Sequence, residues 1–113
     1  MTHLQRWDIV FLKADENDTT GHPSVVISPP DILEDPRQHR FNVLVGTKKP
    51  PASKSKSSEV QLDAADGLEF STLINATLVY QARKTSVIRT AGRVSYTRRG
   101  QIATKLRAAL GLG

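Results

Sequence analysis

The chain contains no cysteine, few aromatic side chains and no long apolar run. Without cysteine it can form neither a disulfide nor a thiolate metal site, which fits a reducing cytoplasm. A helix that crosses a bilayer needs about 20 consecutive apolar residues, and no segment supplies them. The histidines His3, His22 and His39 show no metal-ligand spacing. We therefore expect one cytoplasmic domain over residues 1–113, without a membrane segment, metal or cofactor.

Acidic side chains are missing from the C-terminal part of the chain. All 11 lie at or before Glu69, whereas eight lysines and arginines follow Phe70. Four further lysines lie in a stretch rich in proline and serine, which predicts a loop: Lys48, Lys49, Lys54 and Lys56. The net charge of +5 suits an anionic partner, either nucleic acid or an acidic protein. The alternative interpretation is a solvated basic surface that keeps the protein soluble.

Short apolar runs between polar loops predict a mainly β fold. The expected strands are residues 7–12, 24–28, 40–46 and 58–63, then 71–82 as one long bent strand or two, and a short last strand at 86–88. Pro23 suits the first position of a strand because proline donates no backbone hydrogen bond. A short helical turn is expected between Pro30 and Pro36.

The C-terminal segment predicts the one long helix. Ser95 can cap its first turn with the side-chain hydroxyl. Ile102, Leu106 and Leu110 recur at intervals of four and give the helix an apolar face. Gly111 stands where a C-terminal glycine cap is expected. About five to six strands followed by one helix imply a small, strongly curved sheet with a helix packed on it.

The order of these motifs resembles the PemK/MazF family of toxin endoribonucleases. Gly21-His22-Pro23-Ser24-Val25-Val26-Ile27-Ser28-Pro29 is similar to the family's Gly-x-Arg-Pro and the buried strand after it. Asp66-Gly67-Leu68 also fits the family, and Gly92-Arg93-Val94-Ser95 resembles its approach to the final helix. The resemblance covers almost the whole chain. It implies a mainly β fold (α+β by content) of the SH3-like barrel type, usually a homodimer.

The same resemblance implies a ribosome-independent, metal-free endoribonuclease toxin that cuts single-stranded mRNA. An antitoxin with an acidic, partly disordered tail is expected to neutralise it by covering the basic surface. The family's catalytic arginine and threonine positions are occupied here by His22 and Thr47. An imidazole can act as base or acid near neutral pH, although it lacks the permanent forked charge of arginine. We expect His22 to transfer the proton and Thr47 to hydrogen-bond the phosphate.

Six further residues are predicted to contact RNA. Four are the loop lysines Lys48, Lys49, Lys54 and Lys56. Some family members carry an arginine and an aspartate on the strand matching residues 73–78, and this chain has neither. Ser71 and Asn75 are the polar candidates near that strand, and the alternative is that they are ordinary outer-face residues.

Two other functions remain open from the sequence. The exchange of arginine for His22 suits a catalytically degenerate relative that binds RNA or an antitoxin without cutting. A gyrase-poisoning toxin of the same fold is a third possibility, but its C-terminal Trp-Gly-Ile is replaced here by Gly111-Leu112-Gly113.

Overall fold

The computed structural model describes residues 3–48 and 57–112. These residues form a seven-stranded antiparallel sheet in the order β4-β5-β3-β2-β1-β7, with β6 paired to β3 off this path. The strands are β1 (Asp8–Leu12), β2 (His22–Val26), β3 (Arg40–Lys48), β4 (Glu59–Leu62), β5 (Thr72–Asn75), β6 (Tyr80–Arg83) and β7 (Val87–Arg93). The helices are α1 (Pro30–Glu34), the short 3-10 turns η1 (Ala64–Asp66) and η2 (Lys84–Ser86), and α2 (Tyr96–Leu110).

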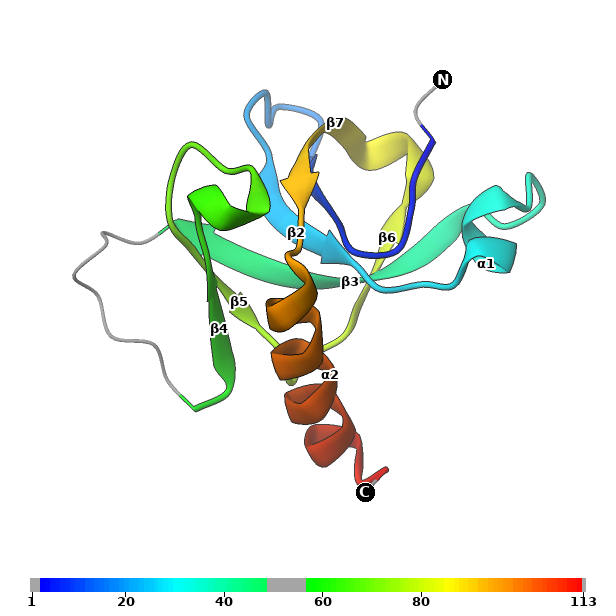
Figure 1. The fold of residues 1–113 in the computed structure, drawn as a ribbon. Helices are drawn as coiled ribbons and strands as arrows, with labels where there is room; N and C mark the ends of the chain where they lie inside the picture. The colour runs from blue at the N-terminus through cyan, green and yellow to red at the C-terminus, as the bar shows by residue number, and fades with distance from the viewer. Residues whose placement is uncertain (1–2, 49–56, 113) are drawn as a thin grey trace.

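The sheet curls into a half-barrel, and α2 runs away from it toward the C-terminus (Figure 1). The predicted small curved sheet with a C-terminal helix is confirmed. The segment 71–82 forms two strands, because the Asn75 side chain accepts hydrogen bonds from the Thr77 amide (3.0 Å) and hydroxyl (2.7 Å) and closes a turn. Both strands then pair with the long β3, β6 along its first half and β5 along its second.

Both faces of the sheet carry apolar residues. The α2 face holds a core that includes Ile9, Val25 and Leu44 and receives Ile102 from the helix. The opposite face holds a second core, to which α1 contributes Leu33. A curved sheet that is apolar on both faces needs cover on both, and two helices and the loops supply it. Among the described residues, no helix is long and apolar enough to cross a bilayer.

The final helix begins where the sequence predicts, but not by the predicted contact. Ser95 is the N-cap residue, yet its hydroxyl makes no capping hydrogen bond. Its backbone amide instead donates to Asp66 Oδ1 at 2.7 Å. Gly111 adopts the left-handed conformation (φ 68°) and closes the C-terminus, as predicted. Only the first half of the apolar face is covered, since Ile102 is fully buried while Leu110 is 54% exposed.

A carboxylate anchors this helix to the sheet. The Asp66 side chain is fully buried and accepts hydrogen bonds from the amides of Ser95 and of Asp63 (2.9 Å). Arg98 of α2 donates to Asp66 and, through two guanidinium nitrogens, to Asp63 at 2.8 and 3.1 Å. The Arg98 hydrogen bond, together with the Ala65 amide, holds the pKa of Asp63 below its usual range, and Asp63 and Asp66 in turn raise the pKa of Arg98. The turn predicted at Asp66-Gly67 thus supplies a buried carboxylate that anchors α2 to the sheet.

The lowered pKa of Asp63 predicts an acid-sensitive fold. A carboxyl whose pKa is lower in the folded state stabilises the protein above the unfolded value of about 3.9, and the contribution is lost as pH falls through the folded pKa. We expect the free energy of unfolding, measured by urea denaturation, to decrease below about pH 4. Asp63→Asn should flatten that decrease, because it removes the carboxyl whose pKa is lowered by Arg98. An equal slope in the variant would contradict this assignment.

The space around Gly92 explains why the Gly92-Arg93-Val94-Ser95 motif begins with glycine. A Cβ at this position would lie 2.2 Å from the backbone oxygen of Asp66, which cannot move without shifting η1. Gly92→Ala is therefore expected to destabilise the protein by about 1–3 kcal/mol in urea denaturation.

Gly100 provides the control, because a Cβ added there meets nothing within 4 Å. It lies inside α2, where alanine is favoured over glycine by about 0.5–1 kcal/mol, so Gly100→Ala should stabilise the protein. Equal effects of the two substitutions would show that the close approach at Gly92 is not what selects glycine.

Candidate functional site

His22 and Thr47 lie on two neighbouring strands. β2 and β3 pair with Ser24 opposite Val45, and His22 and Thr47 each lie two residues further along their strands, toward the same end of the pair. Residues two positions apart in a strand share a face, so His22 and Thr47 lie on the face of Ser24 and Val45. Both side chains are exposed, His22 to 60%. Two residues 25 positions apart in the sequence are thus brought to one face of the sheet.

The glycine before Thr47 fixes which face this is. A Cβ added to Gly46 would point at Ile74 Cδ1 (2.5 Å) and would lie 3.2 Å from the Pro23 carbonyl oxygen. Ile74 belongs to the core on the α2 face. Because successive strand residues point to opposite faces, Thr47 points to the other face, away from α2.

A groove runs along this opposite face beside His22. It has a volume of about 480 Å³, and its lining includes Ser24, Val45, Lys13 and Tyr80. Tyr80 is 50% exposed, so an aromatic ring is available for stacking on a nucleobase. Lys13 brings a positive charge. The groove thus combines an imidazole, a cation and an exposed ring.

Asp18 organises the loop that delivers His22 to the groove. Its carboxylate accepts hydrogen bonds from the amides of Ala14 (2.9 Å), Gly21 (2.8 Å) and Thr20 (3.2 Å). These bonds, the Ala14 amide first, lower the pKa of Asp18, so the carboxylate stays ionised at neutral pH. Asp18 Oδ2 lies 3.9 Å from His22 Nε2. The loop thus places a fixed carboxylate beside the imidazole.

Ser71 and Asn75 lie at the far side of the same face, on or beside β5. Leu73 pairs with Thr47, so the residues two positions before and after it share the face of Thr47. Both side chains have partners: Ser71 Oγ accepts from Gln61 Nε2 at 3.5 Å, and Asn75 Oδ1 holds the turn described above. Glu59 stands opposite Asn75 and places a carboxylate there. Ser71 and Asn75 thus share the face of Thr47, and both are engaged in hydrogen bonds within the sheet.

Of the four predicted loop lysines, the structure describes only the position of Lys48. Lys48 is the last residue of β3, while Lys49, Lys54 and Lys56 lie outside the described residues. In residues 3–48 and 57–112, no group of three His, Asp or Glu side chains gathers as a metal-binding set.

No protein-family model matches the sequence, and no curated protein matches it. Solved structures do match its fold. An endoribonuclease from mycobacterial species, in complex with its cognate antitoxin, superposes with a TM-score of 0.77 over 100% of this chain and 98% of that one, at 18% identity. The Mycobacterium tuberculosis toxin MazF-mt6 matches at a TM-score of 0.74 and 16% identity, over 94% and 98% of the two chains. A MazE–MazF complex from Deinococcus radiodurans gives 0.75 and 17%, over 98% of each chain.

The chain has the MazF fold. The match spans essentially the whole length of both chains, so the predicted resemblance is confirmed at the level of architecture. At 14–18% identity, likeness to the MazF structures fixes the course of the backbone and leaves the chemistry to the side chains of this chain.

Two residues of the candidate site are missing from the sequence predictions: Asp18 beside His22, and Tyr80 in the groove. Asp18 lies in a polar loop, where an aspartate is unremarkable, and its one sequence signal is its position four residues before His22. Tyr80 lies in an apolar run that reads as core. Its exposure arises because β6 is an edge strand within the described sheet, paired only with β3. Only the tertiary structure brings Tyr80 to the groove and Asp18 beside His22.

Proposed function

We propose that this protein is a MazF-type toxin endoribonuclease that cuts single-stranded RNA in the cytoplasm without a metal ion. The observation that carries the proposal is the placement of His22 and Thr47 on one exposed face, toward the same end of β2 and β3, in a MazF fold. The groove supplies the remaining requirements for binding a strand: a cation at Lys13 and an exposed ring at Tyr80. The lysines Lys48, Lys49, Lys54 and Lys56 add charge for the phosphate backbone.

The reaction begins at the ribose 2′-hydroxyl. The neutral imidazole of His22 takes its proton, and the 2′-oxygen attacks the adjacent phosphorus. The ionised Asp18 stabilises the imidazolium, and the Thr47 hydroxyl donates a hydrogen bond to the negatively charged phosphorane oxygens. The bond to the 5′-oxygen then breaks, and the imidazolium returns its proton to that leaving oxygen. The products are a 2′,3′-cyclic phosphate and a free 5′-hydroxyl, and His22 is regenerated.

The proposal includes two protein partners. One is a second copy of the chain in a symmetric dimer, and exposed apolar side chains beside β6 and on and after α2 support it: Leu78, Leu110 and Leu112. The other is an antitoxin whose acidic tail lies over His22 and Thr47 and excludes RNA. Sedimentation of the pure protein measures the first, and inhibition of cleavage by the co-expressed antitoxin measures the second.

The deciding experiment uses pure protein and a long single-stranded RNA in EDTA. Cleavage at a short fixed sequence, with 2′,3′-cyclic phosphate ends, is the expected result. The second candidate is a protein that binds RNA without cutting it, and the high exposure of His22 favours it, because an imidazole in water is less firmly positioned than a buried one. Intact RNA together with measurable binding would establish that candidate instead.

A further inference from the structure

Two arginines face each other across neighbouring strands at the other end of β3. Arg40 of β3 pairs directly with Arg83 of β6, so the two side chains share one face with Cβ atoms about 5 Å apart. Like charges placed directly opposite each other destabilise a sheet. Within residues 3–48 and 57–112, neither guanidinium forms an ion pair with a carboxylate. The fold therefore keeps an uncompensated double positive charge at this point.

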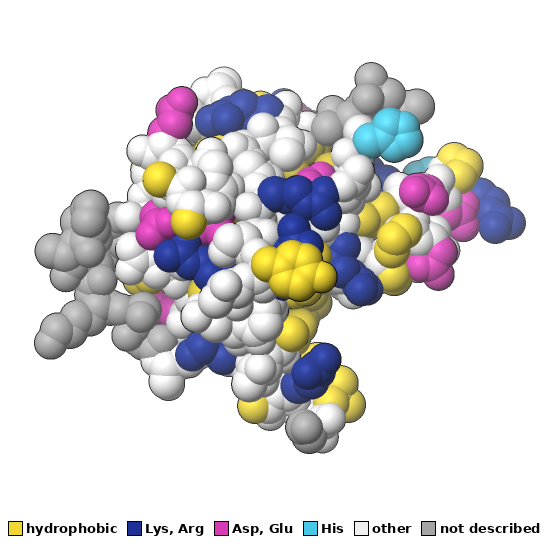
Figure 2. All heavy atoms as spheres, viewed as in Figure 1, with side chains coloured by type: hydrophobic (Ala, Val, Ile, Leu, Met, Phe, Trp, Pro, Cys, Tyr) yellow, Lys and Arg dark blue, Asp and Glu magenta, His cyan; other side chains and the backbone are white. Residues whose placement is uncertain are grey.

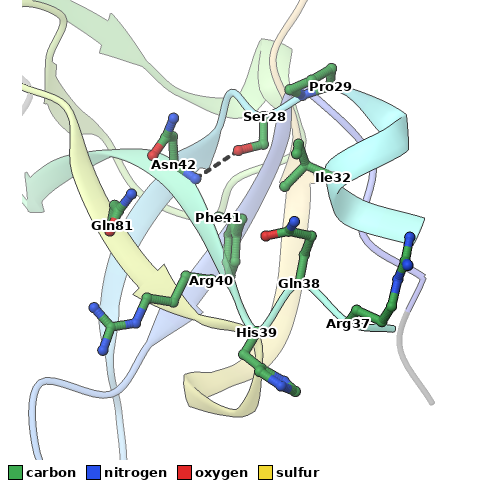
Figure 3. Close-up of a pocket in the computed structure, with 10 residues that line it drawn as sticks. All are labelled: Ser28, Pro29, Ile32, Arg37, Gln38, His39, Arg40, Phe41, Asn42 and Gln81. Carbon is green, nitrogen blue, oxygen red and sulfur yellow. Dashed lines mark hydrogen bonds between the residues drawn. The ribbon is translucent and has the colours of Figure 1, made fainter. Parts of the chain in front are cut away.

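Two cavities without acidic lining residues lie beside the arginine pair. Two shallow cavities of about 440 and 450 Å³ meet here and share Gln38, His39 and Arg40 as lining. Neither cavity is lined by an aspartate or glutamate. Arg83 borders the second cavity, and Gln81 borders the first. Figure 3 shows Arg40 and Gln81 on the same side of the first cavity, extending from β3 and β6.

The carboxylate that directly follows α1 is already engaged by another arginine. Figure 2 shows acidic side chains gathered over α1, away from the basic ones along the middle of the molecule. Asp35, just after α1, is engaged by Arg37, with its Oδ1 3.2 Å from the guanidinium Nε. Lys84 places its ammonium on the carbonyl oxygens of Ile32 and Asp35, each at 2.9 Å. The local carboxylate thus has its cation, and the arginine pair has none.

The backbone beneath the pair is rigid. The Asn42 amide donates to Ser28 Oγ at 2.7 Å, its carbonyl accepts from the Ile27 amide at 3.0 Å, and the Lys84 amide donates to the His39 carbonyl at 2.9 Å. These bonds tie both strands to their neighbours. The Cβ atoms of the two arginines are thereby held at a fixed spacing, from which both guanidinium groups can reach one ligand.

We infer that Arg40 and Arg83 form a phosphate-binding site beside the first half of β3, and Arg83 and Gln81 also border the His22 groove. Two forked guanidinium groups 5 Å apart at their Cβ atoms, about the spacing of a cross-strand pair, suit bidentate contacts to one phosphate. The side-chain amides of Gln81 and Gln38 add hydrogen-bond donors for the rest of the ligand. Arg40 lies seven residues before Thr47, roughly 23 Å along the strand, and on the α2 face. The phosphate belongs either to a polynucleotide strand or to a free phosphate ester, and the site does not depend on whether the chain cleaves RNA.

The test measures binding to a ligand that cannot be cut. Fluorescence anisotropy with a short 2′-O-methyl RNA gives Kd, and thermal unfolding with inorganic phosphate gives the shift in Tm. Arg40→Gln and Arg83→Gln should each weaken RNA binding about tenfold, reduce its salt dependence by about 0.7 per lost contact, and abolish any phosphate-induced rise in Tm. Arg107→Gln, which removes the same charge from an exposed position on α2, should change Kd less than about twofold.

The two probes separate the sources of the phosphate. Loss of RNA binding in the two variants identifies a polynucleotide, and loss of the Tm shift alone identifies a free phosphate ester. Either result supports the site. Equal effects of Arg40→Gln, Arg83→Gln and Arg107→Gln on both probes would overturn it. So would a lower Tm of Arg83→Gln in phosphate-free buffer, because relief of a like-charge pair should leave Tm unchanged or raise it.

Discussion

Replacement of His22 by alanine is expected to abolish RNA cleavage and leave the fold intact. General acid–base catalysis by one side chain is worth about 100- to 10,000-fold in rate, and here a single imidazole carries both proton transfers. The side chain is 60% exposed and contributes to neither core, so the melting temperature should not change. Rates of cleavage of a labelled RNA, measured beside circular dichroism of each variant, test both statements.

Two further variants serve as a rescue and as a control for this experiment. His22→Arg rebuilds the arginine of the MazF-type motif and should keep or raise activity. His3→Ala removes another exposed histidine, outside the groove, and should cleave at the native rate. A His22→Ala protein that cuts RNA as fast as the native one would remove His22 from the mechanism, and Thr47 and the lysines would then have to be tested without it.

Replacement of Arg98 by leucine is expected to destabilise the protein by about 3–5 kcal/mol, because it leaves the fully buried Asp66 carboxylate without its cation. Small domains have a total stability of about 5–15 kcal/mol, so the variant should be close to unfolding at room temperature. Urea denaturation measures the difference. Arg107→Leu, on the same helix but exposed, should cost less than about 1 kcal/mol.

The double variant Asp66→Asn with Arg98→Leu isolates the cause. A neutral amide can still accept a backbone hydrogen bond, and no charge remains buried, so the double variant should recover part of the lost stability. If the double variant is less stable than Arg98→Leu alone, loss of packing rather than the unpaired charge explains the effect.

Local patterns were sufficient to locate most of the elements. Alternating and β-branched runs predict β1 to β4, and the fourfold spacing of Ile102, Leu106 and Leu110 with Gly111 predicts α2. These signals succeed because backbone preference and amphipathic periodicity are properties of neighbouring residues. The last strand was predicted too short. β7 continues through Arg89, Thr90 and Arg93, because pairing with β1 stabilises an extended conformation that polar residues do not predict by themselves.

The sequence by itself determined that His22 and Thr47 follow the order of a toxin motif, and that the chain is basic after Glu69. It did not determine which other residues lie next to them in the folded protein. Register alone brings His22 and Thr47 to one face and sets Arg40 opposite Arg83. Burial alone turns Asp66 from a turn residue into the anchor of α2. Pairing and burial depend on residues far apart in the chain, so no local pattern encodes them, and the tertiary structure decides which charges are satisfied and which remain free for a ligand.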